Sequence, residues 1–106
     1  SKVVPDLTVI CEKDGLNDKN YVGVPTLIVE ILSHSNQSHD LVTKMNLYQR
    51  FGVKEYWIVN PSFNSIQIYA LNERGLYEQA GVYKNNEIAL SKVFGDFRIE
   101  LNNIFL

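Results

Sequence analysis

Two segments in the first third of the chain are almost continuous runs of apolar residues. Residues 3–11 are rich in valine and isoleucine, with Pro5 near the start, where a missing backbone N–H is least harmful to a sheet. Residues 27–32 are apolar at every position except Glu30. Such a run is typical of a strand that is buried on both faces. We therefore expect two strands, separated by a polar loop that contains two glycines.

The pattern changes to a helical period in the next segment. Leu41, Met45, Tyr48 and Phe51 recur at spacings of three and four residues, and the polar residues 33–40 before them offer several helix caps. Gly52 follows directly, and glycine just beyond the last periodic residue is a common helix stop. The pattern predicts a helix of about four turns that ends near Gly52.

The rest of the chain has the features of β-structure. Residues 55–60 form another apolar run and residues 65–71 alternate with period two, so a short turn between them predicts a hairpin. Residues 76–83 and 87–90 are expected to be short outer strands, and the segment up to Leu106 a β-rich tail. The order predicts an α/β (α+β) fold, a mixed sheet with one main helix packed on it.

Composition fits one small domain, residues 1–106. Of the 106 residues, 45% are hydrophobic and 21% charged, which is a globular balance with a thin core. The net charge of −2 gives no basic signature of a protein that coats nucleic acid, although acidic metal ligands lower the charge of a nuclease. A single cysteine, Cys11, excludes an internal disulfide framework and is compatible with a reducing cytoplasm. No apolar stretch approaches the roughly 20 residues that span a membrane.

Glu30 is the most informative residue for chemistry. A carboxylate inside the run L-I-V-E-I-L must be protonated, paired or bound to a metal, because burying an unpaired charge is very costly. Asp6 begins the other apolar strand. If the strands are neighbours, both carboxylates can meet at one end of the sheet, where a cation would relieve their repulsion. Mg²⁺ could be bound by these two side chains, the backbone carbonyl of Ile31 and waters. The alternatives for Glu30 are a glutamate at the margin of the sheet or one paired with a nearby lysine, and the alternative for Asp6 is a turn residue at the start of the strand.

Lys44 is the third candidate. It shares a helix face with Tyr48, four residues later, and with Asp40, one turn earlier. If this face meets the carboxylates, Lys44 could orient a water and stabilise a pentavalent phosphate. The alternative is an exposed salt bridge with Asp40, which would contribute little.

The two histidines and the aromatic pair in the apolar strand are weaker candidates for a functional role. His34 and His39 could suggest a zinc site, but no cysteine or further histidine completes a ligand set, so polar loop residues are the better interpretation. Tyr56 and Trp57 lie in an apolar strand and are expected in the core rather than as platforms for stacking bases.

Four motifs, in order, resemble a known family. They are V-V-P-D-L-T-V-I, V-P-T-L-I-V-E-I-L-S, D-L-V-T-K-M-N-L-Y and G-V-K-E-Y-W-I-V-N-P, followed by a similar C-terminal F-G-D-F-R-I-E-L-N-N-I-F. The set is similar to the Uma family of putative restriction endonucleases, which belongs to the PD-(D/E)XK nuclease superfamily. The resemblance covers nearly the whole chain, and the ordered set is more specific than any one motif.

The resemblance implies an endonuclease that uses Mg²⁺ or Mn²⁺ and acts on nucleic acid, with DNA as the expected substrate. Asp6 matches the aspartate of the P-D motif and Glu30 the second acidic residue. The usual lysine would stand at Leu32, but in this family it is displaced to the helix, where Lys44 matches it and Tyr48 matches a recurrent tyrosine.

The resemblance also raises an alternative. Family members carry a further helix and hairpin before the P-D strand, so we expect this chain to lack that part. A catalytically inactive remnant that acts as an interaction module is therefore the second hypothesis. Because exposed sheet edges invite pairing, we also expect a homodimer.

Overall fold

A five-stranded mixed sheet forms the centre of the molecule. The computed structural model describes residues 7–10, 24–32 and 38–105, with side chains for 24–32 and 41–105. The strands lie in chain order across the sheet: β1 (Leu7–Ile10), β2 (Leu27–Ile31), β3 (Glu55–Asn60), β4 (Ser65–Leu71) and β5 (Tyr77–Lys84). Only β2 and β3 pair in parallel; the other neighbours are antiparallel. The mixed sheet, the β3–β4 hairpin and the neighbouring first two strands confirm the predictions.

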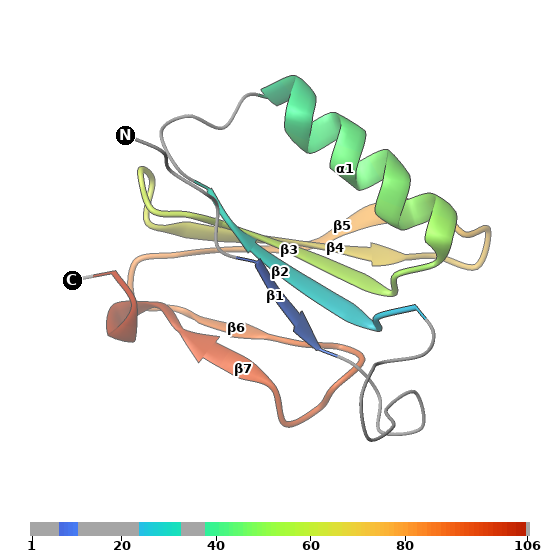
Figure 1. Ribbon diagram of the computed structural model, residues 1–106. Helices are drawn as coiled ribbons and strands as arrows, with labels where there is room; N and C mark the ends of the chain where they lie inside the picture. The colour runs from blue at the N-terminus through green and yellow to red at the C-terminus, as the bar shows by residue number, and fades with distance from the viewer. Residues whose placement is uncertain (1–6, 11–23, 33–37, 106) are drawn as a thin grey trace, which may run out of the picture.

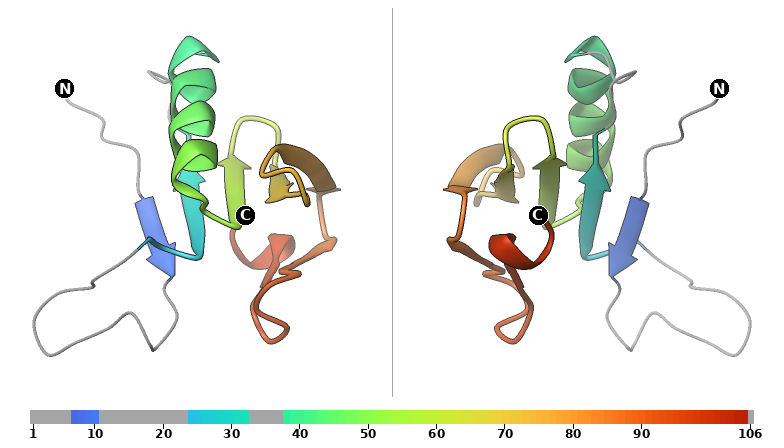
Figure 2. Two further views of the ribbon diagram at one scale, coloured as in Figure 1. Left: turned by 90° about the vertical axis from the view of Figure 1, so that its right-hand side faces the viewer. Right: turned by 90° about the vertical axis from the view of Figure 1, so that its left-hand side faces the viewer.

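The helix α1 (Ser38–Phe51) connects the two parallel strands and covers one face of the sheet (Figure 1). The opposite side is occupied by the C-terminal part of the chain, as the side views show (Figure 2). This part comprises β6 (Ile88–Leu90) and β7 (Arg98–Glu100), which form a separate two-stranded sheet, and the short 3₁₀ helix η2 (Leu101–Asn103). The chain therefore folds as three layers with the sheet in the middle.

Covering both faces explains why β2 and β3 are apolar at nearly every position. Leu27 and Val29 of β2 pack with Trp57 and Val59 of β3 in a core on the side of the C-terminal segment. The intervening residues, including Ile28, Tyr56 and Ile58, form a second core beneath α1. Since successive side chains of a strand point to opposite faces, each strand contributes to both cores. The expectation that Tyr56 and Trp57 are core residues is confirmed, as both are fully buried.

The predicted stop of the helix at Gly52 is also confirmed. Gly52 has a φ of 82° and donates its N–H to the Gln49 carbonyl, and Val53 donates to the Tyr48 carbonyl. This pair of hydrogen bonds is a Schellman motif, which glycine favours because it adopts positive φ without strain. Leu41, Met45 and Tyr48 pack on the second core, as their spacing predicts.

The C-terminal segment differs from the sequence prediction in part. The strand expected at residues 76–83 joins the main sheet, but the one expected at 87–90 pairs with β7 instead. The predicted β-rich tail contains only three strand residues, Arg98–Glu100, followed by η2. No helix in the described part of the chain is long and apolar enough to cross a membrane.

Candidate metal and catalytic site

Glu30 lies on the face of β2 that is covered by the helix. It is next to the last residue of that strand and pairs in register with Ile58 of β3. Its exposed fraction is only 1%. A carboxylate at this depth needs hydrogen-bonding or ionic partners to remain charged.

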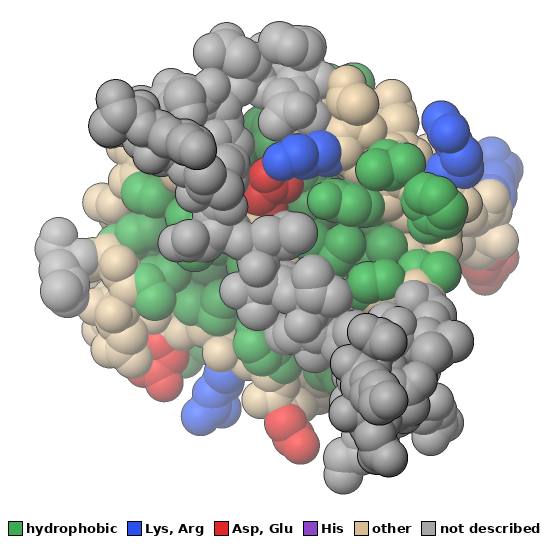
Figure 3. Space-filling view, viewed as in Figure 1, with side chains coloured by type: hydrophobic (Ala, Val, Ile, Leu, Met, Phe, Trp, Pro, Cys, Tyr) green, Lys and Arg blue, Asp and Glu red, His purple; other side chains and the backbone are tan. Residues whose placement is uncertain are grey.

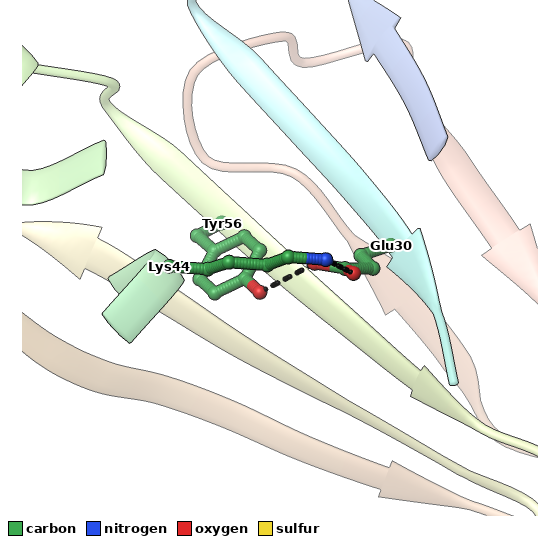
Figure 4. Close-up of polar contacts among 3 residues, drawn as sticks. All are labelled: Glu30, Lys44 and Tyr56. Atoms are coloured by element: carbon green, nitrogen blue, oxygen red, sulfur yellow. Dashed lines mark hydrogen bonds and ion pairs between the residues drawn. The ribbon is translucent and has the colours of Figure 1, made fainter. Parts of the chain in front are cut away.

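Two side chains from different elements provide these partners (Figure 4). The Tyr56 hydroxyl, on β3, donates to Oε1 of Glu30 over 2.8 Å. The Lys44 ammonium reaches down from α1 and forms an ion pair and hydrogen bond with Oε2. Each carboxylate oxygen therefore has its own donor. Lys44 therefore pairs with Glu30, which is the ion-paired alternative that the sequence allowed for this glutamate. The side chain of Asp40 is not among those described, so its pairing with Lys44 stays a prediction.

Lys44 is more accessible to solvent than Glu30 and Tyr56. Its side chain is 29% exposed, whereas Glu30 and Tyr56 are buried. A lysine stem is flexible, so the ammonium can move toward an anion outside the protein without unpacking the core.

Two tyrosine rings, those of Tyr48 and Tyr77, pack against the Tyr56 ring. Tyr48 of α1 meets it edge-on, with ring centroids 5.0 Å apart and an interplanar angle of 71°. Tyr77 of β5 stacks on it at 6.4 Å and donates its hydroxyl to the Val53 carbonyl over 2.7 Å. Burial, with a smaller contribution from Tyr48, raises the pKa of Tyr77 well above its ordinary range. Tyr48 therefore contacts the ring of the residue that donates to Glu30.

Asp6 lies outside the described residues, so its expected approach to Glu30 stays a prediction. The adjacent backbone is described: Leu7, the first residue of β1, pairs with Glu30. Ile31 is the last residue of β2, as its suggested role as a carbonyl ligand requires. Cys11 and His34 also fall outside the described residues, and the side chain of His39, in α1, is not among those described.

A second buried carboxylate, Glu55, occupies the other face of the sheet. Its oxygens accept hydrogen bonds from Trp57 Nε1 at 3.0 Å, Ser91 Oγ at 2.8 Å, and the backbone N–H groups of Lys92 and Val93 at 2.7 and 2.9 Å. These donors join β3 to the C-terminal segment. Glu55 therefore has a structural role, which the sequence analysis did not identify.

The donor set at Glu30 fits a hard divalent cation. Carboxylate oxygens are preferred ligands of Mg²⁺ and Mn²⁺, but in this structure Oε1 of Glu30 accepts from Tyr56 and Oε2 pairs with the partly exposed Lys44. Within the described residues, no three His, Cys, Asp or Glu side chains gather closely enough to hold a metal ion. A complete ligand set therefore requires a contribution from Asp6, from backbone carbonyls or from water.

The sequence analysis missed Tyr56 as a partner of Glu30. The available signal was a tyrosine inside a buried strand, because a buried phenol hydroxyl usually requires a hydrogen-bonding partner. Which partner it uses depends on the parallel pairing of β2 and β3, which places Ile28 beside Tyr56 and Glu30 beside Ile58. Tyr56 is therefore both a core residue and a donor.

Comparisons with known proteins agree with this fold. The uncharacterized protein slr1290 of Synechocystis sp. is 24% identical over 98 residues, which are 92% of this chain and 52% of that protein. The crystal structure of a putative nuclease belonging to DUF820, from Anabaena variabilis, superposes with a TM-score of 0.65 at 15% identity, over 92% of this chain and 52% of that one. The chain thus spans about half the length of these two proteins. The model of the Uma2 family, described as putative restriction endonuclease, matches residues 1–102. The chain therefore belongs to the Uma2 family, and its fold is shared with a nuclease-like structure.

Proposed function

We propose that this chain is the core of an endonuclease that uses Mg²⁺ or Mn²⁺ to hydrolyse phosphodiester bonds in nucleic acid, with DNA as the substrate. The observation that carries the proposal is the almost fully buried Glu30 carboxylate, one oxygen of which pairs with the partly exposed ammonium of Lys44. Family membership and the nuclease-like fold support the same class of reaction.

Each site residue has a distinct role in this proposal. Glu30, Asp6 and the carbonyl of Ile31 would hold the metal ion, which polarises a phosphate and lowers the pKa of a bound water. Lys44 would turn from Glu30 toward the phosphate and stabilise the negative charge that develops there. Tyr48 contacts Tyr56 and would keep the helix beside the carboxylate.

The contribution of Asp6 has a geometric requirement. Side chains of successive residues in a regular strand point to opposite faces. Leu7 pairs with Glu30, so a strand that continued without change would not direct Asp6 to the same face as Glu30. The proposal therefore requires the chain to leave the regular strand geometry at Asp6, immediately before β1 begins.

The charge distribution indicates how substrate would be recognised. The net charge is −2, and on the face shown in Figure 3 the lysine and arginine side chains are scattered among apolar ones. Non-specific attraction to the phosphate backbone, which depends on such cations, should thus be weak. We expect the metal ion to contribute much of the affinity for the scissile phosphate.

Plasmid cleavage by the full chain in Mg²⁺ or Mn²⁺ tests the proposal. Wild-type protein should nick or cut DNA, and cleavage should stop with a chelator. Glu30→Gln and Lys44→Ala should each reduce cleavage by about 100-fold or more, because loss of one charged group that stabilises a transition state has this magnitude. Lys44→Arg should restore little, since a planar guanidinium does not replace a compact ammonium.

Matched controls distinguish the site from general charge effects. Lys84→Ala removes an exposed lysine on β5 and Glu73→Gln an exposed glutamate in a turn, and both should retain wild-type cleavage. Metal-dependent cleavage that persists in Lys44→Ala would remove this lysine from the site. A folded protein that never cleaves nucleic acid would favour the second hypothesis, an inactive nuclease fold that serves as an interaction module.

A further inference from the structure

Tyr56 and Lys44 hold the same carboxylate with very different rigidity. The Tyr56 ring is fully buried and fixed between the Tyr48 and Tyr77 rings, so its hydroxyl cannot leave Oε1 of Glu30 without disturbing the core. The Lys44 side chain is 29% exposed, and its long flexible stem can turn away from Oε2 without disturbing the core. The two donors are therefore a permanent partner and an exchangeable one.

This asymmetry matters for a carboxylate with a chemical role. If Lys44 turned away with no other donor present, Glu30 would be an almost unexposed charge able to sample several rotamers. A fixed hydrogen bond to one oxygen restricts those rotamers and leaves the other oxygen available in a defined direction. Partners of this kind orient ligand side chains in metal sites, and their loss typically lowers metal affinity about 10–100-fold.

We infer that Tyr56 is the positioning residue of Glu30: its hydroxyl keeps the carboxylate in place when Lys44 leaves Oε2. The inference rests on the proposed metal-dependent function for its purpose, but the hydrogen bond itself is a property of the protein alone. It adds to the proposed function a buried residue of β3 that acts on the site only through Glu30.

Metal binding is the first test, with Mn²⁺ as the probe, measured by calorimetry and by electron paramagnetic resonance. Tyr56→Phe should bind Mn²⁺ about 10-fold more weakly or worse. Raising the Mn²⁺ concentration should then restore its cleavage rate, which would not happen if the variant were only misfolded. Tyr69→Phe is the matched control: it also removes a phenol hydroxyl from the sheet, but one that donates to Gln67, and its Mn²⁺ affinity should stay within about twofold. Wild-type affinity in Tyr56→Phe would overturn the inference.

A metal-free measurement separates this inference from the proposed function. With ¹³C-labelled glutamate carboxyl groups, the Glu30 carbon should give one sharp resonance in the wild type and a broadened or split one in Tyr56→Phe. An unchanged resonance overturns the inference, whether or not the protein binds Mn²⁺ or cleaves DNA. Absence of both metal binding and cleavage in the wild type would instead refute the proposed function.

Lys44→Ala keeps the inference testable if Tyr56→Phe does not fold. This variant mimics the state in which the lysine has left Oε2, and it alters a partly exposed helix position. The Glu30 carboxyl resonance should remain single, because Tyr56 still holds Oε1. A resonance that broadens as soon as the lysine is removed would show that Lys44, and not Tyr56, positions the carboxylate, and would overturn the inference.

Discussion

Two buried glutamates stabilise their charge in different ways, and the difference separates a chemical role from a structural one. Glu55 accepts hydrogen bonds from an indole, a hydroxyl and two backbone N–H groups, all held by the fold. Glu30 has one fixed donor, Tyr56, and one partly exposed cation, Lys44. A ligand or substrate can replace only the second kind of partner. Glu30 is therefore the carboxylate to which we assign the proposed chemical role.

Tyr77 leads to a prediction about stability at high pH. The ordinary pKa of a tyrosine is 10.0, and burial raises that of Tyr77 in the folded state. Above pH 10 the unfolded chain loses the phenol proton while the folded protein keeps it. The unfolded state then binds fewer protons, so the free energy of unfolding falls as pH rises beyond 10 and is unaffected below it.

Denaturant unfolding of wild type and Tyr77→Phe at several pH values between about 8 and 11 checks this prediction. The variant should be less stable at pH 8, because it loses the hydrogen bond to the Val53 carbonyl. Its stability should then decline less steeply than that of the wild type. Parallel curves for the two proteins would show that Tyr77 does not contribute to the pH dependence.

At the scale of elements, the positions of α1 and of the C-terminal segment depend on a few local structures. The Schellman motif at Gly52 ends the helix and directs Val53, which is buried, into the second core. The turn after β6 presents the N–H groups of Lys92 and Val93 to Glu55. The Schellman motif sets where the helix that carries Lys44 ends. The turn after β6 attaches the C-terminal layer to the opposite face of the sheet.

Gly52→Ala should lower the free energy of unfolding by about 1 kcal/mol, since alanine is strained at positive φ. No heavy atom lies within 4 Å of the position that a Cβ would occupy, so backbone strain is the only cost. Gly95→Ala is the matched control, because the space there is equally open and its φ is not in the left-handed region. Denaturant unfolding measures both. Equal stability of the two variants would contradict a role for Gly52 in ending the helix.

Glu55→Gln should destabilise the protein by about 2–3 kcal/mol. The amide nitrogen of glutamine would face N–H and O–H donors from which the carboxylate accepts hydrogen bonds, and hydrogen bonds to charged groups are worth about 1.5–3 kcal/mol each. The fluorescence of Trp57, the single tryptophan, should change as well, since its Nε1 donates to this carboxylate. Glu73→Gln, at an exposed turn, serves as the control. A variant as stable as wild type would mean that the other contacts of the C-terminal segment suffice.

At the scale of the whole molecule, the described sheet has two edge strands, β1 and β5. An edge strand has backbone groups available for pairing with another chain. Val82 on β5 is 44% exposed, so this edge is not protected by charge at that position. The expected homodimer has not been tested and stays a prediction, for which β5 is a specific candidate surface.

Sedimentation velocity tests whether the protein forms a homodimer through β5. The wild type should sediment as a dimer, and Val82→Lys should shift it to a monomer, because a lysine on an edge strand opposes strand pairing. Val42→Lys changes a valine on α1 that is more exposed than Val82, and it should leave the dimer intact. A wild-type monomer at high concentration would refute the dimer, and a dimer that survives Val82→Lys would exclude β5 as its interface.

Local patterns in the sequence were sufficient for the helix and for the β3–β4 hairpin. The bounds of β3 and β4 agree with the predicted strands, and the helix ends beside Gly52 as predicted. These features depend on alternation, helical spacing and the conformational freedom of glycine, all of which act between residues close in sequence. Burial of Glu30 could likewise be expected from its apolar neighbours alone.

Only the tertiary structure decided which residues meet. Lys44 is 14 residues from Glu30 and Tyr56 is 26, and both contacts depend on a helix that crosses from β2 to a parallel β3. Glu55 meets Ser91 across 36 residues, on the opposite face. From spacing alone, the sequence favoured Asp40 as the partner of Lys44, because side-chain spacing on a helix describes one element and not its neighbours. Strand register and the packing of α1 on the sheet determine these contacts, since they fix the face and the depth at which each side chain lies.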